Sequence, residues 1–335
     1  MKGKRFVAAA AVAALGTLTA CGGSEGGTSA SGEGADYPKG PVTVTAPADP
    51  GSGWDTTARA LVETLQKEDL VKSPLPVQNR PGATGSVWLS QMITSYKGAD
   101  DQIAITSLPI MSNQLRGRTK NGYEDVTMIA RLFTEYYIVV VPASSKYKSL
   151  KDLVGAIKAN PKSVPVGAAG DDRLPFGLVV KAGGGDPKSI NFINYEGGGD
   201  EITALLNGDV QAAVAGVSEF RGQLLAGKLR GLGVLREKRL AAPLDNVPTA
   251  KEQGYDVTLA NWRGVYGPPD MPDYAVKYWR STLKKAMRTG TWKKFAKRNQ
   301  WTTTYMDGRE MKQYLEKTNA DIKDALRSIG QYKSG

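Results

Sequence analysis

Residues 42–65, VTVTAPADPGSGWDTTARALVETL, contain the pattern that predicts the fold of this chain. Residues 42–46 form a short segment rich in Val and Thr, which is typical of a strand, and residues 47–53 hold the prolines and glycines of a turn. From Trp54 onward, apolar residues recur at the spacing of one helical face: Ala58, Leu61, Val62 and Leu65. The stretch is therefore predicted to be a strand, a glycine-rich turn and an amphipathic helix.

The same arrangement recurs along the chain. The predicted units are strand 76–80 with turn 81–85 and a helix containing Val87, Trp88 and Met92; strand 103–106 with Ser107 as cap of a helix at 108–115; strand 164–168 with turn 169–172; strand 190–195 with turn 197–200; and strand 210–216 with turn 217–219. A further strand is predicted at 137–141. Alternating strands and helices predict an α/β protein whose parallel sheets are covered by helices on both faces. Ligands of such sheets bind beyond the carboxyl ends of the strands, where these turns lie.

The glycine-rich turns indicate the kind of ligand. A turn from strand to helix presents the unpaired amides of the helix, and glycine lets the backbone approach a ligand closely. Anions are favoured at such helix ends, so several turns around one cleft would suit a ligand with several carboxylates. Each glycine can equally serve only to make a tight turn. Nucleotide phosphate is disfavoured, because the chain has no G-x-x-x-x-G-K-[ST] motif and residues 51–56, GSGWDT, lack the third glycine of the dinucleotide fingerprint.

The amino-terminal segment predicts export. Lys2, Lys4 and Arg5 precede an apolar run that is shorter than the ~20 residues needed to span a bilayer, which is typical of a signal peptide at residues 1–20. Residues 18–21, LTAC, resemble the bacterial lipobox, so Cys21 is expected to carry a diacylglycerol that anchors the chain to the membrane. Residues 21–36 are rich in Gly and Ser and predict a flexible tether.

Composition excludes several classes of function. The chain has no histidine, and its one cysteine is assigned to lipid, so Ser-His triads, Cys-His dyads and the common zinc sites are excluded. An enzyme built on carboxylates or lysine stays open, although no motif favours one. The net charge of +11, or +8 after removal of the three basic residues of the signal, is densest at 277–298. That spacing is typical of the exposed faces of amphipathic helices, and nucleic-acid binding is not expected.

Several segments in order resemble one family, the extracytoplasmic solute-binding receptors of tripartite tricarboxylate transporters (Bug-type receptors). They are PADPGSGWDTTAR (47–59), VQNRPGATGSVW (77–88), IVVVPASSKYKSLKDL (138–153), NYEGGGDEITALLNGDVQAAVAG (194–216), GKLRGLGVL (227–235), VPTAKEQGYDV (247–257) and LANWRGVYGPPDMP (259–272). The resemblance extends over nearly all of the chain after the tether.

The resemblance implies a two-domain clamp of the periplasmic-binding-protein (Venus flytrap) type, which closes around its ligand. Domain 1 would comprise residues 37–140 and 262–335, and domain 2 residues 141–261. The substrate-binding residues are expected in six turns: Gly51, Ser52, Gly53, Trp54 and Asp55; Ala83, Thr84 and Gly85; Thr106 and Ser107; Ala169, Gly170, Asp171 and Arg173; Gly198, Gly199 and Asp200; Ser218 and Glu219.

Some of these residues have a second interpretation. Asp55 can accept a hydrogen bond from a ligand or cap its own helix, and the cap is favoured. Arg173 stands where many relatives have histidine, and it can either pair with a ligand carboxylate or lie at the surface beside Asp171 and Asp172. Trp54 can cover the ligand or serve packing alone, and Trp262 is expected beside the hinge.

The expected function is that of a receptor, not an enzyme. It would be a lipoprotein on the outer face of the cell membrane, capture a citrate-like di- or tricarboxylate, and deliver it to permease subunits. A sensor subunit of a two-component signalling system is the alternative. No cofactor, metal or nucleic acid is expected to bind, and the receptor is expected to be a monomer. The sequence does not identify the ligand.

Overall fold

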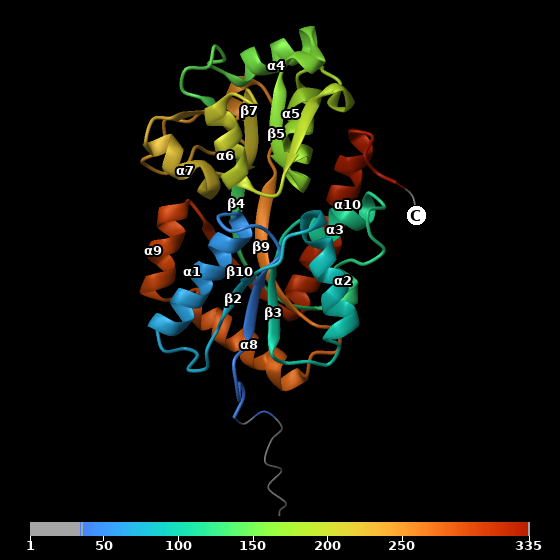
Figure 1. Ribbon diagram of the computed structural model, residues 1–335, viewed down its shortest axis with the longest axis vertical. Helices are drawn as coiled ribbons and strands as arrows, with labels where there is room; N and C mark the ends of the chain where they lie inside the picture. The colour runs from blue at the N-terminus through green and yellow to red at the C-terminus, as the bar shows by residue number, and fades with distance from the viewer. Residues whose placement is uncertain (1–33, 35, 334–335) are drawn as a thin grey trace, which may run out of the picture. The chain divides into compact units, whose positions relative to one another are not determined.

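A computed structural model describes residue 34 and residues 36–333. The chain divides into two compact units, residues 1–35 and residues 36–335, and the fold described below is that of the second. The signal peptide, the acylation site Cys21 and most of the tether, all predicted from the sequence, lie outside the described residues. The second unit holds two groups of strands, which we call the first and the second lobe (Figure 1).

The first lobe is built on strands β1 (Thr43–Ala46), β2 (Val77–Asn79), β3 (Gln102–Thr106) and β10 (Thr302–Asp307), with parts of β4 (Thr127–Pro142) and β9 (Ala260–Gly267). Strand β1 pairs in parallel with β2 and β3, whereas β10 pairs antiparallel with β4. Its helices are α1 (Gly53–Lys67), α2 (Ser86–Ser95), α3 (Pro109–Leu115), α8 (Asp273–Ala286), α9 (Gly290–Asn299) and α10 (Gly308–Ser328).

The second lobe repeats the theme. Its strands are β5 (Pro165–Ala169), β6 (Asn191–Tyr195), β7 (Ala212–Gly216), β8 (Leu229–Val234) and the carboxyl-terminal part of β4. Strand β5 pairs in parallel with β6 and β7. Its helices are α4 (Leu150–Ala159), α5 (Arg173–Ala182), α6 (Gly198–Asn207) and α7 (Val217–Leu225).

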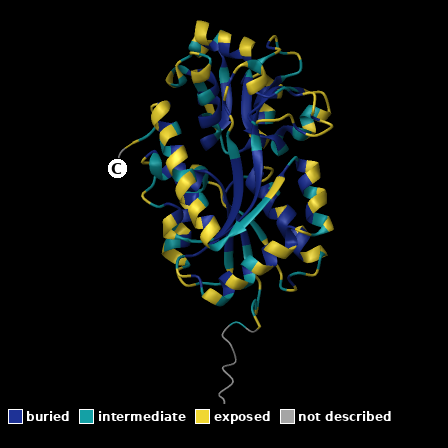
Figure 2. Ribbon diagram, turned by 180° about the vertical axis from the view of Figure 1, so that it is seen from behind, coloured by how far each residue is buried: buried dark blue, intermediate teal, exposed yellow. Residues whose placement is uncertain are grey.

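Two long strands connect the lobes. Strand β4 pairs with β9 and β10 in the first lobe and with β7 and β8 in the second, and both β4 and β9 are buried along most of their length (Figure 2). The predicted crossing points, 140–141 and 261–262, fall within these two strands, while the division into domains stays a prediction.

The predicted strand–turn–helix units are present, and the α/β fold class is confirmed. Two details differ from the sequence-based expectation. Every antiparallel pairing described here involves β4 or β9, because these strands cross between lobes instead of alternating with helices. Ser107 does not cap α3: the side chain of Ser107 bonds Trp54, and the cap position is taken by Leu108.

Not one helix in the described part of the chain combines the length and the apolar character that a membrane crossing requires.

Candidate functional site

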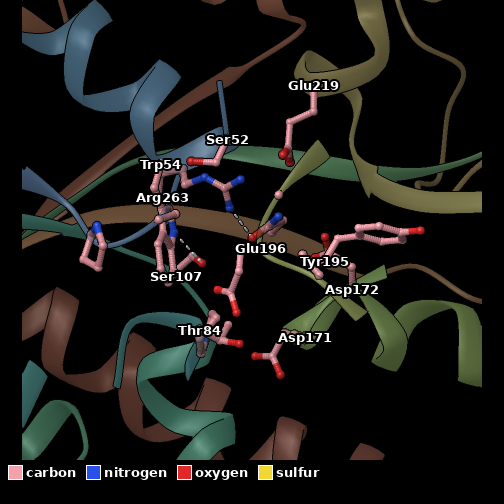
Figure 3. Close-up of a pocket in the computed structure, with 18 of the residues that line it drawn as sticks. Ser52, Trp54, Thr84, Ser107, Asp171, Asp172, Tyr195, Glu196, Glu219 and Arg263 are labelled. Atoms are coloured by element: carbon pink, nitrogen blue, oxygen red, sulfur yellow. Dashed lines mark hydrogen bonds between the residues drawn. The ribbon is translucent and has the colours of Figure 1, made fainter. Parts of the chain in front are cut away.

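The strand-to-helix turns of both lobes surround one cavity, as Figure 3 shows. The cavity contains about 520 Å³ of space between protein atoms, counted together with the open solvent at its mouth. It is lined by Pro47, Ala48, Ser52, Gly53, Trp54, Thr84, Ser107 and Pro109 of the first lobe, by Ala169, Gly170, Asp171, Asp172, Tyr195, Glu196, Gly197 and Glu219 of the second, and by Tyr137, Asn261 and Arg263 of the crossing strands.

The turn before α1 supplies one wall. The Ser52 side chain accepts a hydrogen bond from the Asp55 amide at 3.3 Å and so caps the helix. Asp55 does not line the cavity: its carboxylate accepts bonds from the Gly51 amide at 2.9 Å, from Arg59 at 2.9 and 3.0 Å and from Asn79 at 3.0 Å. Although burial opposes the effect, these bonds lower the pKa of Asp55 below its ordinary value. In this structure Asp55 therefore stabilises the turn.

The Trp54 indole lies beside this turn and lines the cavity. Its Nε1 donates to the Ser107 hydroxyl at 3.0 Å, which joins α1 to the end of β3. Gly85 packs against the ring: a Cβ at Gly85 would lie 2.9 Å from Trp54 Cζ3. The sequence predicts that the backbone amide of Gly85 contacts the ligand. The structure adds a second role, because the absence of a side chain at Gly85 makes room for the Trp54 indole.

The second wall of the first lobe is the short 3₁₀ turn at Ala83–Gly85. Ala83, Thr84 and Gly85 all have left-handed backbone conformations, with φ of 48°, 52° and 83°. Left-handed conformations at non-glycine residues are costly and cluster at functional sites. The turn reaches the second lobe, because a Cβ on Gly170 would overlap the Thr84 side chain.

A buried arginine lies on the floor of the cavity. Arg263, from β9, is 3 % exposed, and it donates to Glu135 at 3.2 Å and to Asn261 at 2.5 Å. Its Nε has no partner in the described part of the chain. Glu135 also accepts a bond from the Ser218 amide at 2.7 Å, so Ser218 supports this pair without lining the cavity.

A second buried ion pair joins the two lobes. Asp171, at the end of β5, accepts bonds from Ser112 and Arg116 of α3. The side chains of Arg116 and Asp171 are 4 % and 3 % exposed. Asp171 lines the cavity as predicted, but Arg116 already neutralises its charge.

Three further carboxyl groups on the wall belong to the second lobe: Asp172, Glu196 and Glu219. Burial raises the pKa of all three. Neighbouring acids raise these pKa values further. At Asp172 the added charges are those of Glu219 and Glu201, and at Glu196 they are those of Asp49 and Asp200. At Glu219 the added charge is that of Glu135. The wall that was predicted to hold anions thus carries several acids.

Arg173 points to a different neighbourhood. It donates to Asn194 at 3.0 Å, and its guanidinium lies 5.5 Å from the centre of the Phe192 ring. Burial and the charges of Arg118 and Arg116 lower its pKa. Arg173 does not line the cavity in this structure.

The structure thus separates the predicted residues into two groups. Those on the cavity wall are Ser52, Gly53, Trp54, Thr84, Ser107, Ala169, Gly170, Asp171 and Glu219. Those outside it are Gly51, Asp55, Ala83, Gly85, Thr106, Arg173, Gly198, Gly199, Asp200 and Ser218.

The lining residues that were absent from the predicted site are Pro47, Ala48, Pro109, Tyr137, Asp172, Tyr195, Glu196, Gly197, Asn261 and Arg263. Asp172 lies inside the predicted turn 169–172 and Glu196 immediately precedes the predicted turn 197–200, so both were within reach of the sequence pattern. Arg263 lies inside a strand, where nothing local distinguishes it. In the described ranges, no three Asp, Glu, Cys or His side chains are grouped so that they would hold a metal ion.

Comparison with known proteins gives one family. Residues 57–330 match the model of the tripartite tricarboxylate transporter family receptor. A protein encoded in the gbd 5' region of Cupriavidus necator is 26 % identical over 301 residues, which cover 89 % of this chain and 90 % of the relative.

Solved structures share the fold. The periplasmic binding protein BugD superposes with a TM-score of 0.81 at 20 % identity, over 89 % of this chain and 100 % of that one. An R. palustris protein solved with adipate gives a TM-score of 0.80 at 22 % identity, over 88 % and 99 % of the two chains. At these identities the likeness shows the two-domain periplasmic-binding fold alone.

Proposed function

This chain belongs to the tripartite tricarboxylate transporter receptor family, a family of periplasmic solute-binding receptors, and we propose that it captures a small organic carboxylate in its cavity and delivers it to a membrane permease. The turns that line the cavity belong to two lobes joined by β4 and β9, an arrangement suited to closure around a ligand. Binding and release would then require no covalent chemistry.

The observation that carries the proposal is Arg263. A guanidinium that is 3 % exposed and lines the cavity brings a positive charge to the site, and guanidinium groups form charge-assisted hydrogen bonds with carboxylates. The turns at Ser52–Gly53 and Thr84 also line the cavity. Arg263 thus offers a carboxylate a charged donor from the lining of the cavity.

The preference for a citrate-like di- or tricarboxylate stays a prediction. The R. palustris relative solved with the dicarboxylate adipate supports it. The acids Asp172, Glu196 and Glu219 on the cavity wall oppose it, because like charges repel in a poorly solvated cleft.

Calorimetry tests the receptor function. We expect adipate or succinate to bind and the matching neutral diamide not to bind, with Arg263→Lys lowering the affinity at least tenfold because lysine cannot reproduce the planar fork of donors. Arg309→Lys, on α10 outside the cavity, is the matched control. Equal affinity for acid and diamide would refute the proposal.

Anchoring through lipid at Cys21 is part of the same proposal, and it rests on the lipobox-like residues 18–21. Cys21→Ser is expected to move the receptor out of the membrane fraction. A variant that sediments with membranes as fully as the parent would exclude the anchor.

A further inference from the structure

The charges on the cavity wall do not balance. Asp171 is bonded to Arg116, and Glu135 is bonded to Arg263, so each of these two acids already has a cationic partner. Asp172, Glu196 and Glu219 remain, and within residues 36–333 no lysine or arginine forms an ion pair with any of them. An anionic ligand alone would add to this uncompensated negative charge.

The three acids differ in how well the protein satisfies them. Glu219 accepts bonds from the amides of Gly198 at 3.0 Å and Gly216 at 3.3 Å. Glu196 accepts a hydrogen bond from the Thr84 backbone amide. Asp172 lines the cavity, and no hydrogen bond or ion pair to it is formed by the described residues. Asp172 and Glu196 are therefore the acids with most capacity left for a ligand.

The cavity has two chemically different sides. Figure 3 shows the guanidinium of Arg263 near Trp54 and Ser52, whereas the carboxylate of Glu196 points into the space between Thr84 and Asp171. On the first side, the Nε of the buried Arg263 has no hydrogen-bond partner among the described residues, so a ligand atom that accepts a hydrogen bond would be favoured there. On the other side, the carboxylates favour a ligand group that donates hydrogen bonds and carries a positive charge.

We propose that the ligand carries a cationic nitrogen as well as a carboxylate, and that Glu196 and Asp172 bind this nitrogen while Arg263 binds the carboxylate. The proposal rests on the receptor function above and names its substrate class: amino acids and related amino-substituted organic acids. One bound ammonium supplies the donors and the charge that the second side of the cavity lacks.

Matched pairs of probes test the substrate class. Calorimetry at pH 8 compares succinate with aspartate, glutarate with glutamate, and butyrate with 4-aminobutyrate, because each pair differs by one amino group. We expect at least one amino compound to bind ten or more times tighter than its partner, and no pair to show the reverse preference. Binding of the plain acids at equal or higher affinity would overturn the proposal and leave the receptor function intact.

Variants locate the nitrogen. Glu196→Gln and Asp172→Asn keep the shape of each side chain and remove its charge, and each is expected to weaken the amino probe at least tenfold while leaving its plain partner unchanged or strengthened. Asp209 is exposed and lies shortly after the end of α6, so Asp209→Asn is the control that shows how far the loss of any one negative charge changes the affinity. A gain in affinity for both members of a pair in Glu196→Gln would show that Glu196 only competes with the ligand carboxylate, and the proposal would be wrong.

The sign of the pH dependence is a third test. The charged groups that face the two acids are Glu219, Glu201, Asp171, Asp49, Asp200 and Arg263. Because the pKa of Asp172 and of Glu196 is raised, both begin to gain protons above the ordinary carboxyl range. Affinity for the amino probe is therefore expected to fall as the pH is lowered from 8 toward the ordinary carboxyl range, whereas a rise would refute a cation at this position.

Two remaining outcomes are also decisive. Binding of citrate only when Mg²⁺ is present would assign the positive charge to a chelated metal and overturn the cationic nitrogen. Binding of neither member of any pair would refute the receptor function for small organic acids, and the present proposal with it.

Discussion

At the scale of single residues, Trp54 decides the shape of the cavity wall. The indole is 8 % exposed, donates to Ser107 from the end of β3, and packs against the backbone of Gly85. Three segments that are far apart in the sequence thus meet at one aromatic ring. Its position depends on Gly85 having no side chain.

Replacement of Gly85 by alanine is expected to displace this ring. The added Cβ would lie 2.9 Å from Trp54 Cζ3, and alanine must also adopt a φ of +83°. We expect a loss of about 2–3 kcal/mol in the free energy of unfolding and a more than tenfold weaker ligand affinity. Urea unfolding and calorimetry measure the two effects.

Gly98 offers a matched control, because its φ is +76° and no atom lies within 4 Å of an added Cβ. Gly98→Ala is expected to cost only about 1–2 kcal/mol of backbone strain and to leave binding unchanged. Equal effects at both glycines would show that contact with Trp54 is unimportant.

At the scale of elements, the first turn of α6 places a carboxylate in the interior. Glu201 is fully buried, next to Glu219 and behind the cavity wall. Burial and the charge of Glu219 raise the pKa of Glu201 well above its ordinary value, and the Ala169 amide opposes the shift. The helix therefore begins with a carboxyl group whose ionisation opposes folding.

Removing this charge is expected to stabilise the protein. A carboxyl with a raised pKa in the folded state binds more protons than in the unfolded state, so its contribution to stability falls as the pH rises from the ordinary carboxyl range through the raised value. Glu201→Gln should raise the free energy of unfolding by about 1–2 kcal/mol at pH 8, and by less at pH 5.

Asp200→Asn, on the same turn but exposed, should change stability by less than about 0.5 kcal/mol at either pH. Chemical denaturation at both pH values separates the variants. A gain at Glu201 that grows as the pH falls would contradict the assigned direction of the pKa shift.

At the scale of the whole second unit, the contacts between lobes set how far the cavity can open. Arg116 and Asp171 form a buried pair between α3 and the turn after β5. Gly197 packs against the Ser52 side chain, and Gly170 against the Thr84 side chain, so turns of the two lobes are in close contact at both glycines. Trp262, which was expected beside the hinge, is fully buried in β9 with its ring edge-on to Tyr314 at 6.1 Å between centres.

Breaking the interlobe pair is expected to open the molecule. Asp171→Asn leaves Arg116 with an uncompensated charge that water solvates only when the lobes part. We expect small-angle scattering to show a larger radius of gyration without ligand, and calorimetry to show a several-fold weaker affinity. Asp321→Asn, which breaks the exposed Lys317–Asp321 pair of α10, is the control. An unchanged radius would mean that the pair does not hold the lobes together.

Local pattern accounts for the elements that the sequence predicted correctly. The strand, turn and helix around Gly53 depend on the spacing of residues within a few positions, so α1, α2 and α5 begin near the predicted positions. The amino-terminal half of β4, residues 127–136, was missed. Its neighbours are β9 and β10, more than 120 residues later, and its own sequence does not indicate them.

The sequence by itself determined the α/β fold class, the family and the turns from which the cavity lining comes, because each depends on short stretches of chain. Only the tertiary structure decided what the cavity contains. Arg263 meets Glu135 across 128 residues, and Asp171 meets Arg116 across 55. Charge balance in a cleft depends on which side chains are brought together and removed from water, and spacing along the chain does not encode it.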